Sequence, residues 1–300
     1  MLLPFDEGKL PEHLTMTASR LYLPKLESPP LTILEYLFAR FPRIDPSIWR
    51  ERVSRGVVTL SDGTTVSEDS PYRHGIFVFY RKEVPSEPAP AEEPLIIHRD
   101  EDILIVDKPH GMPVTPVGQY VERSLLACLQ RTTGLDTLAP MHRLDSETAG
   151  LLLLTTNVDV RGQYHRLFAE GLIEKEYRAI AYIKDAANRM HWRIENRIER
   201  GEPWFRQKIV EGPANAITEI ELLEQHEGTG LFRLVPRTGK KHQLRVHMAS
   251  IGFPIIGDPF YPEISKKREG DPPLQLLANR LAFIDPRSGE PRSFTSRRLL

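Results

Sequence analysis

Residues 83–94, with the sequence EVPSEPAPAEEP, constrain the organisation of this chain more than any other segment. They contain four prolines, four glutamates and almost no large apolar side chain. This composition is typical of an extended, solvated linker, because proline interrupts regular structure and like charges repel one another. A chain of 300 residues is long enough for about two domains. We therefore expect an irregular lead-in at residues 1–30, a small domain at 31–82, the linker, and a larger domain at 95–300.

The composition favours a globular protein of a reducing compartment. Hydrophobic residues make up 40% and charged residues 27%, which is ordinary for a chain that buries a core. The longest apolar run, 149–154, is far short of the roughly 20 residues that span a bilayer. The only cysteine, Cys128, excludes an internal disulfide and a cysteine-based zinc site. The first residues do not resemble a signal or transit peptide. We expect a cytoplasmic protein without membrane contact.

The small domain has the pattern of two helices followed by two strands. Apolar residues over 31–38 are spaced for one helical face, and Asp45-Pro46 can begin a second helix that ends at Gly56. Strands are expected at 57–60 and 76–80. The second helix is expected to point Ile48, Trp49 and Val53 inward and Arg50, Arg52 and Arg55 outward.

The larger domain is predicted to be rich in strands, with few helices. A hairpin is expected at 95–98 and 103–106. Further strands are expected at 151–155, 177–183, 192–198, 205–210, 216–223 and 231–235, and helices at 121–132, 157–171 and 241–251. Such an order favours an α+β fold over regular βαβ winding.

Charge is concentrated locally rather than spread over the chain. The net charge is −1, but residues 233–247 hold five Lys or Arg, two His and no Asp or Glu. A basic strip on a nearly neutral protein suits an anionic partner bound in one groove.

Three short clusters contain residues capable of chemistry: 141–145, 175–177 and 237–245. Each has an ordinary structural explanation when taken alone. An aspartate in a loop after Pro140 is commonly a turn residue, a strand tyrosine such as Tyr177 commonly packs, and a run of charges is commonly a solvated face.

Together the three clusters resemble the RluA-type pseudouridine synthases. Residues 142–153 are similar to that family's active-site motif, which reads His-Arg-Leu-Asp, two variable residues, Thr-Ser-Gly and an apolar strand. Lys175 and Tyr177 match its Lys-x-Tyr strand, and residues 238–261 match its third motif. Order and spacing agree over about residues 95–290. The departures are Ala149 for Ser, Lys240-Lys241 for Arg-Thr, and Leu277 where a His is common; we assign them to substrate preference.

The resemblance implies a mixed, mainly antiparallel sheet and an isomerase that converts uridine to pseudouridine in RNA. The base is detached from the ribose, rotated and rejoined through carbon 5, so neither a cofactor nor a metal is required. An ionised carboxylate is required as nucleophile or base. The resemblance assigns that group to Asp145, with its role left open, and a neighbouring cation to Arg245, which favours the charged carboxylate. Tyr177 would lie against the uracil, and Leu244 would add an apolar wall.

RNA recognition is assigned by the same resemblance. A base inside a helix must leave its stack to react, and Arg143 would fill or brace the vacated position. Phosphate contacts would come from Arg237, Lys240, Lys241 and Arg245, and RNA contacts are considered for His142 and His242. His247 is expected to be structural. Trp204 and Phe205 could stack on bases, but we expect them to pack in the core.

The small domain resembles the ribosomal-protein S-four-like RNA-binding module, which would place Arg50, Arg52 and Arg55 against RNA. We expect a monomer acting on ribosomal large-subunit RNA rather than transfer RNA. An RNA-binding protein or folding chaperone without catalysis is the alternative. A nucleosidase is a third class, and it would need a second acid, for which Glu147 is the near candidate.

Overall fold

A computed structural model describes residues 18–300 of the chain, except 43, 82–86, 88–91, 118–119 and 184–189. The chain divides into two compact units. The small unit consists of residues 1–87 together with the short segment 118–122, and the larger unit consists of 88–117 and 123–300. The division falls within residues 83–94. Most of that segment lies outside the described residues, so its character as a linker stays a prediction.

The small unit is a three-stranded sheet with two helices. Its elements are β1 (Ala18–Tyr22), α1 (Ile33–Arg40), α2 (Pro46–Ser54), β2 (Val58–Leu60) and β3 (Phe77–Arg81). Both helices and the two later strands are confirmed. The irregular lead-in is wrong for residues 18–22, which form β1 and pair antiparallel with β3. This pairing uses the free edge of β3, a long-range contact that no local pattern reveals. Residues 1–17 lie outside the described part.

Local capping fixes where these helices begin. The Thr32 hydroxyl accepts from the Glu35 amide while the Glu35 carboxylate accepts from the Thr32 amide, a capping box for α1. Asp45 caps α2 and Pro46 occupies its first turn.

One face of α2 differs from the sequence prediction. Trp49 and Val53 are buried as expected, but Ile48 is exposed and Arg52 is only 6% exposed. Residues 49, 52 and 53 share one helical face, and the guanidinium carbon of Arg52 lies 5.0 Å from the centre of the Trp49 ring. The arginine therefore packs on the indole instead of pointing into solvent.

The larger unit is built on one extended sheet. Its strands are β4 (Leu95–Arg99), β5 (Ile103–Lys108), β6 (Ala139–Pro140), β7 (Ala149–Thr155), β8 (Glu174–Tyr182), β9 (His191–Arg200), β10 (Gln207–Val210), β11 (Ala216–His226), β12 (Thr229–Pro236), β13 (Leu276–Ile284) and β14 (Pro291–Thr295). Its helices are α3 (Leu125–Thr133), α4 (Arg161–Ala169) and α5 (Gln243–Ser250).

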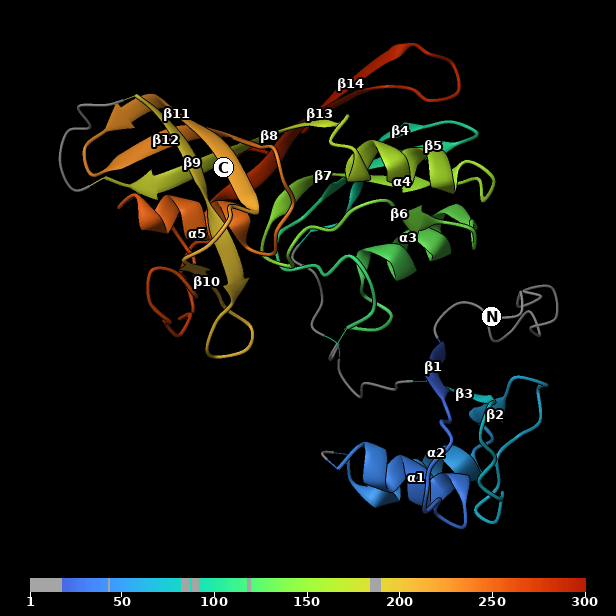
Figure 1. The fold of residues 1–300 in the computed structure, drawn as a ribbon. Helices are drawn as coiled ribbons and strands as arrows, with labels where there is room; N and C mark the ends of the chain where they lie inside the picture. Colours follow the sequence, from blue (N-terminus) through green and yellow to red (C-terminus); the bar gives the residue numbers. More distant parts are fainter. Residues whose placement is uncertain (1–17, 43, 82–86, 88–91, 118–119, 184–189) are drawn as a thin grey trace. The chain divides into compact units, whose positions relative to one another are not determined.

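The strands lie in the order β10-β9-β11-β12-β8-β13-β7-β5-β4, with β14 beside β13 and β6 beside β7 (Figure 1). In the described residues every pairing is antiparallel except that between β13 and β7. The predicted α+β fold with a mixed, mainly antiparallel sheet is therefore confirmed.

Two helices start later than predicted. α3 begins at Leu125, where Ser124 caps it. α4 begins at Arg161, and before it the Asn157 side chain accepts from the Asp159 amide and donates to the Asp102 carboxylate.

The core lies on both faces of the sheet. β5 and β7 are buried along their whole length; alternate residues pack against α3 on one face and α4 on the other. A further cluster joins β8, β11 and β12 to α5. β13 lies between these two halves, so the ends of β7 and β8 meet beside it.

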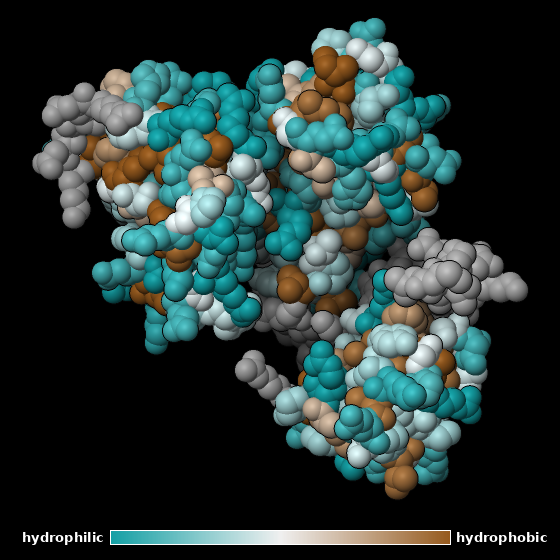
Figure 2. Space-filling model, viewed as in Figure 1, coloured by the Kyte–Doolittle hydropathy of each residue, from teal (hydrophilic) through white to brown (hydrophobic). Residues whose placement is uncertain are grey.

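The face of the molecule drawn in Figure 2 is mainly hydrophilic. On the face drawn in Figure 2, apolar side chains are scattered among hydrophilic ones in each unit. Scattered apolar residues of this kind are normal on globular proteins.

Candidate active site

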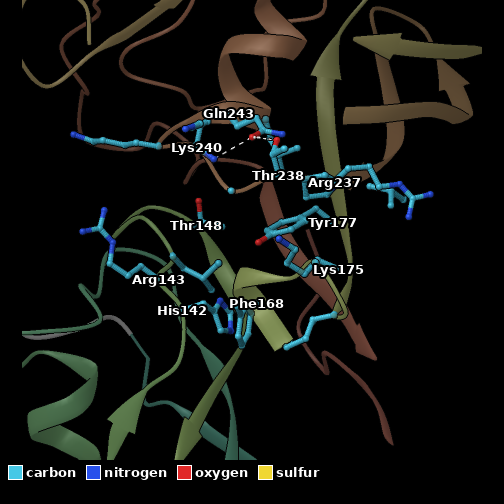
Figure 3. A pocket seen from close by; sticks show the side chains of 18 of the residues that line it. His142, Arg143, Thr148, Phe168, Lys175, Tyr177, Arg237, Thr238, Lys240 and Gln243 are labelled. Carbon is cyan, nitrogen blue, oxygen red and sulfur yellow. Dashed lines mark hydrogen bonds between the residues drawn. The ribbon is translucent and has the colours of Figure 1, made fainter. Parts of the chain in front are cut away.

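A pocket of about 860 Å³ opens in the larger unit where the three predicted clusters meet. Its wall comes from the loop before β7, from α4 through the start of β8, and from the end of β12 through the start of α5 (Figure 3). The structure thus brings together every site residue predicted in this domain, namely His142, Arg143, Asp145, Tyr177, Arg237, Lys240, Lys241, His242, Leu244 and Arg245.

Asp145 is the carboxylate that faces this pocket beside a buried cation. Its side chain is 25% exposed, and Oδ2 lies 3.3 Å from Nη1 of Arg245. The same oxygen lies 3.7 Å from Nε2 of His242. The carboxylate is therefore open to the pocket and has a fixed positive charge beside it.

Arg245 is held chiefly by a second carboxylate, that of Asp258. Nε lies 2.8 Å and Nη2 lies 2.6 Å from the two Asp258 oxygens. Burial lowers the pKa of Arg245, but the hydrogen bonds and charge of Asp258, together with the charge of Asp145, outweigh burial and raise it. Arg245 is 1% exposed, so the prediction that it offers charge to phosphates is wrong, since its donors are turned to carboxylates inside the protein.

Asp258 is a site residue that the sequence analysis missed. It lies inside the third motif, but no spacing shows that its carboxylate will engage Arg245 at both oxygens. One of its oxygens also accepts from the backbone amides of Phe260 and Tyr261. Asp258 therefore fixes the arginine to a loop that follows α5.

Tyr177 projects from β8 toward the pocket (Figure 3). Its ring also packs against the two hydrophobic clusters that meet beside β13. Burial and the charge of Asp145 raise the pKa of Tyr177, so the hydroxyl stays protonated. Lys175 lies two residues earlier on the same face, and burial lowers its pKa.

The two histidines considered for RNA contact are bonded within the protein. His142 stacks on Phe168 at 4.6 Å and accepts from the Leu153 amide at 3.1 Å; burial lowers its pKa to about 3. His242 bonds to the Tyr261 hydroxyl at 3.0 Å, and burial lowers its pKa to about 4. Both are neutral near pH 7, and their contact with RNA stays a prediction.

His247 has the structural role expected of it. It is fully buried, with Nδ1 2.8 Å from the Thr218 hydroxyl and Nε2 3.0 Å from the Asn196 side-chain oxygen.

The exposed cations lie at the pocket's rim. Arg143, Lys240 and Lys241 are exposed, and Arg237 is paired with Glu219 through two hydrogen bonds. Figure 3 shows Arg143 and Tyr177 on opposite sides of the pocket. Arg50 and Arg55 are exposed on the small unit, whereas Arg52 is buried there.

Lys108 is a second residue that the sequence analysis missed. It is fully buried at the end of β5, and Nζ donates to the carbonyl oxygens of Pro109, Met112 and Ser146 at 2.8–3.0 Å. Burial lowers the pKa of Lys108 to about 7, although the negative charges of Glu147 and Asp145 act to raise it. The available signal was a lysine that ends an apolar strand. Its bond to Ser146 ties down the loop that carries Asp145.

The described residues contain neither a cluster suited to a metal ion nor a helix suited to a membrane. No group of three or more His, Cys, Asp or Glu there could hold a metal ion. None of the helices described is long and apolar enough to span a bilayer.

Comparison with known proteins identifies the class. A family model for RNA pseudouridylate synthase matches residues 102–250. The chain is 32% identical over 218 residues to the dual-specificity RNA pseudouridine synthase RluA of Pasteurella multocida, covering 67% of this chain and 91% of that one. It is 30% identical over 267 residues to ribosomal large subunit pseudouridine synthase D of Zymomonas mobilis, covering 81% and 82%.

A solved structure agrees with these sequence matches. The human RNA pseudouridylate synthase domain containing 1 superposes with a TM-score of 0.59 at 25% identity, covering 71% of this chain and 86% of that one. The protein is an isomerase of the RNA pseudouridine synthase family. Within that family it belongs to the RluA type.

Proposed function

We propose that this protein isomerises specific uridines of ribosomal large-subunit RNA to pseudouridine, with Asp145 as the reacting carboxylate and without a cofactor. The observation that carries the proposal is the contact between Asp145 and Arg245, at 3.3 Å, in a pocket that Tyr177 also lines. The reaction changes no oxidation state and transfers no phosphate. It therefore needs a carboxylate beside the sugar and a site that retains the detached base.

Asp145 acts at the sugar, either as nucleophile or as base. Arg245 orients the carboxylate and balances its negative charge, and it does so from a buried position. The Tyr177 ring and the Leu244 side chain form the apolar part of the wall against which the uracil rotates. Confinement of the detached base accelerates its recombination, since the two fragments stay at high effective concentration.

RNA is held at the rim. Arg143 braces the position that the flipped uridine leaves, while Lys240 and Lys241 meet phosphates as point charges. Ribosomal large-subunit RNA is favoured over transfer RNA because one similar relative is named for that subunit. The dual-specificity name of another relative makes transfer RNA the second pool to test.

The small unit adds a further RNA contact through the exposed residues Arg50 and Arg55. The guanidinium of Arg50 lies 5.1 Å from the centre of the Phe38 ring, so one cation is supported by an aromatic side chain. The fold of two helices and two strands is the part of the S-four-like resemblance that supports this contact. Arg50→Gln combined with Arg55→Gln is expected to weaken RNA binding and flatten its salt dependence. Unchanged binding would remove the module from the proposal.

The experiment uses RNA transcripts tritiated at carbon 5 of uracil, because isomerisation expels that hydrogen into water. Ribosomal and bulk transfer RNA transcripts are incubated separately with the wild-type protein and with Asp145→Asn, which keeps the side chain's shape but removes its charge. Release from ribosomal RNA by the wild type alone supports the proposal. Release of tritium from transfer RNA alone would show that ribosomal RNA is the wrong substrate, while the proposed isomerisation would still hold.

Two alternatives give different results in the same assay. An RNA-binding protein or folding chaperone would bind RNA equally well with Asp145→Asn and release no tritium. A nucleosidase would liberate free uracil, with Glu147 as its acid. The Glu147 carboxylate accepts from the Ser146 hydroxyl at 2.7 Å. Chromatography of the products separates free uracil from pseudouridine in the chain.

The oligomeric state and location are also part of the proposal. We expect a monomer in the cytoplasm. Sedimentation of the purified protein with and without RNA tests the first, and fractionation of cells tests the second.

A further inference from the structure

Trp204 is a large aromatic side chain that lies in solvent close to the pocket. Its side chain is 66% exposed, so the expectation that it packs in the core is wrong. It lies in the turn between β9 and β10, and Figure 1 shows this hairpin running beside α5. Tryptophan combines a large flat apolar ring with a polar N–H group, and it is enriched at binding surfaces for that reason.

The turn that carries Trp204 is firmly fixed. The Gly201 amide donates to the Arg206 carbonyl across it, and the Arg206 amide donates to the Pro203 carbonyl. The Gln207 amide donates to the Tyr261 hydroxyl at 2.7 Å, and the Arg206 side chain donates to the Pro262 carbonyl at 2.7 Å. The indole is therefore held out by a rigid support.

Two cations flank the exposed ring. The guanidinium carbon of Arg200 lies 5.8 Å from the ring centre, and Nζ of Lys241 lies 6.0 Å from it. Lys241 itself lines the pocket. An aromatic ring with cations close to it combines the two groups that bind an unpaired nucleotide, since a base stacks on the ring and the phosphates meet the charges.

The ring is also connected to the catalytic residues by a row of aromatic contacts. Trp204 meets Phe205 edge-on at 5.9 Å, and Phe205 lies 5.0 Å from Phe260. Phe260 stacks with His242 at 5.8 Å and lies 5.0 Å from the guanidinium carbon of Arg245. The exposed ring and the pocket therefore belong to one packed assembly.

We propose that Trp204, with Arg200 and Lys241, is a platform on which an unpaired base of the substrate RNA stacks while the target uridine occupies the pocket. This inference rests on the proposed function and narrows its substrate. The RNA must carry an unpaired nucleotide near the target, since a fully paired stem offers no free base face. The platform positions the RNA and does not touch the reacting atoms.

The first test measures binding of a short fluorescent oligouridylate and of a fully paired RNA stem. Trp204→Ala is expected to weaken binding of the oligouridylate about 5- to 150-fold and to change binding of the stem far less. Trp204→Phe keeps a flat ring and is expected to restore most of the affinity. If Trp204→Ala binds the oligouridylate as the wild type does, or if Phe fails to rescue, the stacking platform is wrong.

Salt dependence separates stacking from charge. Trp204→Ala should keep the wild-type slope of affinity against salt, whereas Lys241→Gln should reduce that slope by about one. Tyr182→Ala is the matched control, because Tyr182 is another exposed aromatic residue, 52% exposed, that is absent from the pocket wall. An equal loss of affinity in Tyr182→Ala would show a non-specific surface effect and overturn the proposal.

A kinetic measurement distinguishes failure of this platform from failure of the proposed function. On the RNA transcript that the wild type modifies, Trp204→Ala should raise KM more than it lowers kcat in tritium release. A wild-type KM in this variant would refute the platform and leave the isomerase intact. An inactive wild type that still needs Trp204 to bind oligouridylate would refute the proposed function and leave the platform intact.

Discussion

Arg245 directs two of its three guanidinium nitrogens to Asp258 and only the remaining one to Asp145. The bonds to Asp258 are 2.8 and 2.6 Å long, and the contact to Asp145 is 3.3 Å. Asp258 is buried, whereas Asp145 is partly open to the pocket. The forked pair thus fixes Nη1 beside Asp145, and the contacts of that carboxylate with Arg245 and His242 are both made by Oδ2.

Asp258→Asn should therefore destabilise the protein more than the loss of an exposed ion pair does. The substitution leaves a buried guanidinium with less compensating charge, and breaking a buried pair typically costs about 3–5 kcal/mol. Urea denaturation measures the free energy of unfolding, and Glu174→Gln is the control, because its pair with Arg280 is exposed and is worth about 0–1 kcal/mol. Equal costs in the two variants would contradict the central role of Asp258.

Arg245→Lys separates charge from shape at the same position. Lysine keeps the positive charge but cannot bond to both carboxylates in a forked geometry. We expect the variant to fold with reduced stability and to lose about 10²-fold or more in tritium release. Wild-type release would show that any nearby cation is sufficient.

Tyr177 is expected to act through its ring rather than through proton transfer. Its hydroxyl has a raised pKa, caused first by burial and then by the charge of Asp145, and it is poorly suited to give up a proton. Tyr177→Phe should therefore keep tritium release within about tenfold of wild type, whereas Tyr177→Leu, which removes the flat ring, should lose more. If Phe and Leu fail equally, the hydroxyl is required.

The sequence predicts the elements whose apolar pattern is local. The buried strand predicted at 151–155, the hairpin predicted at 95–106 and the helix predicted to begin at Asp45-Pro46 all follow from spacing and end signals, and all are present. The predictions that are wrong concern elements whose partners are distant in sequence. β1 pairs with the edge of β3, and Asn157, which precedes the start of α4, bonds to Asp102.

The same division holds for the site. The motifs name Asp145, Tyr177 and Arg245, since each belongs to a distinctive run of residues. They do not reveal that Asp258 is the main partner of Arg245, or that Lys108 bonds to the carbonyl of Ser146. These relations join segments far apart in the chain, and only their packing decides which polar groups are paired.

Gly257 is a test of how closely the loop before Asp258 must fold. It has φ of 75°, and a Cβ there would lie 2.3 Å from the Pro273 carbonyl oxygen. Gly257→Ala should cost about 1–3 kcal/mol through overlap and backbone strain and reduce tritium release, because it displaces the partner of Arg245. Gly162→Ala, which meets no atom within 4 Å and is absent from the pocket wall, is the control for thermal unfolding and activity. Equal behaviour of the two variants would show that the loop tolerates the displacement.

His247 should make stability depend on pH in a defined window. Burial lowers its pKa from 6.5 to about 4. Between pH 6.5 and pH 4 the imidazole is therefore protonated in the unfolded chain but neutral in the folded protein. The stability associated with the neutral ring is complete above pH 6.5 and declines as the pH falls through this window. Burial also lowers the pKa values of His142 and His242, so all three histidines contribute to the loss of stability as the pH falls.

His247→Gln isolates the share of that one histidine. The amide does not titrate, so the slope of unfolding free energy against pH inside the window should fall by up to about 1.4 kcal/mol per pH unit. Urea titrations of wild type and variant at several pH values from 4 to 6.5 measure the two slopes, and titrations above pH 6.5 should run parallel. Identical slopes inside the window would mean that His247 binds its proton equally well in the folded and unfolded chain. Its bonds to Thr218 and Asn196 would then be able to accommodate the charged ring.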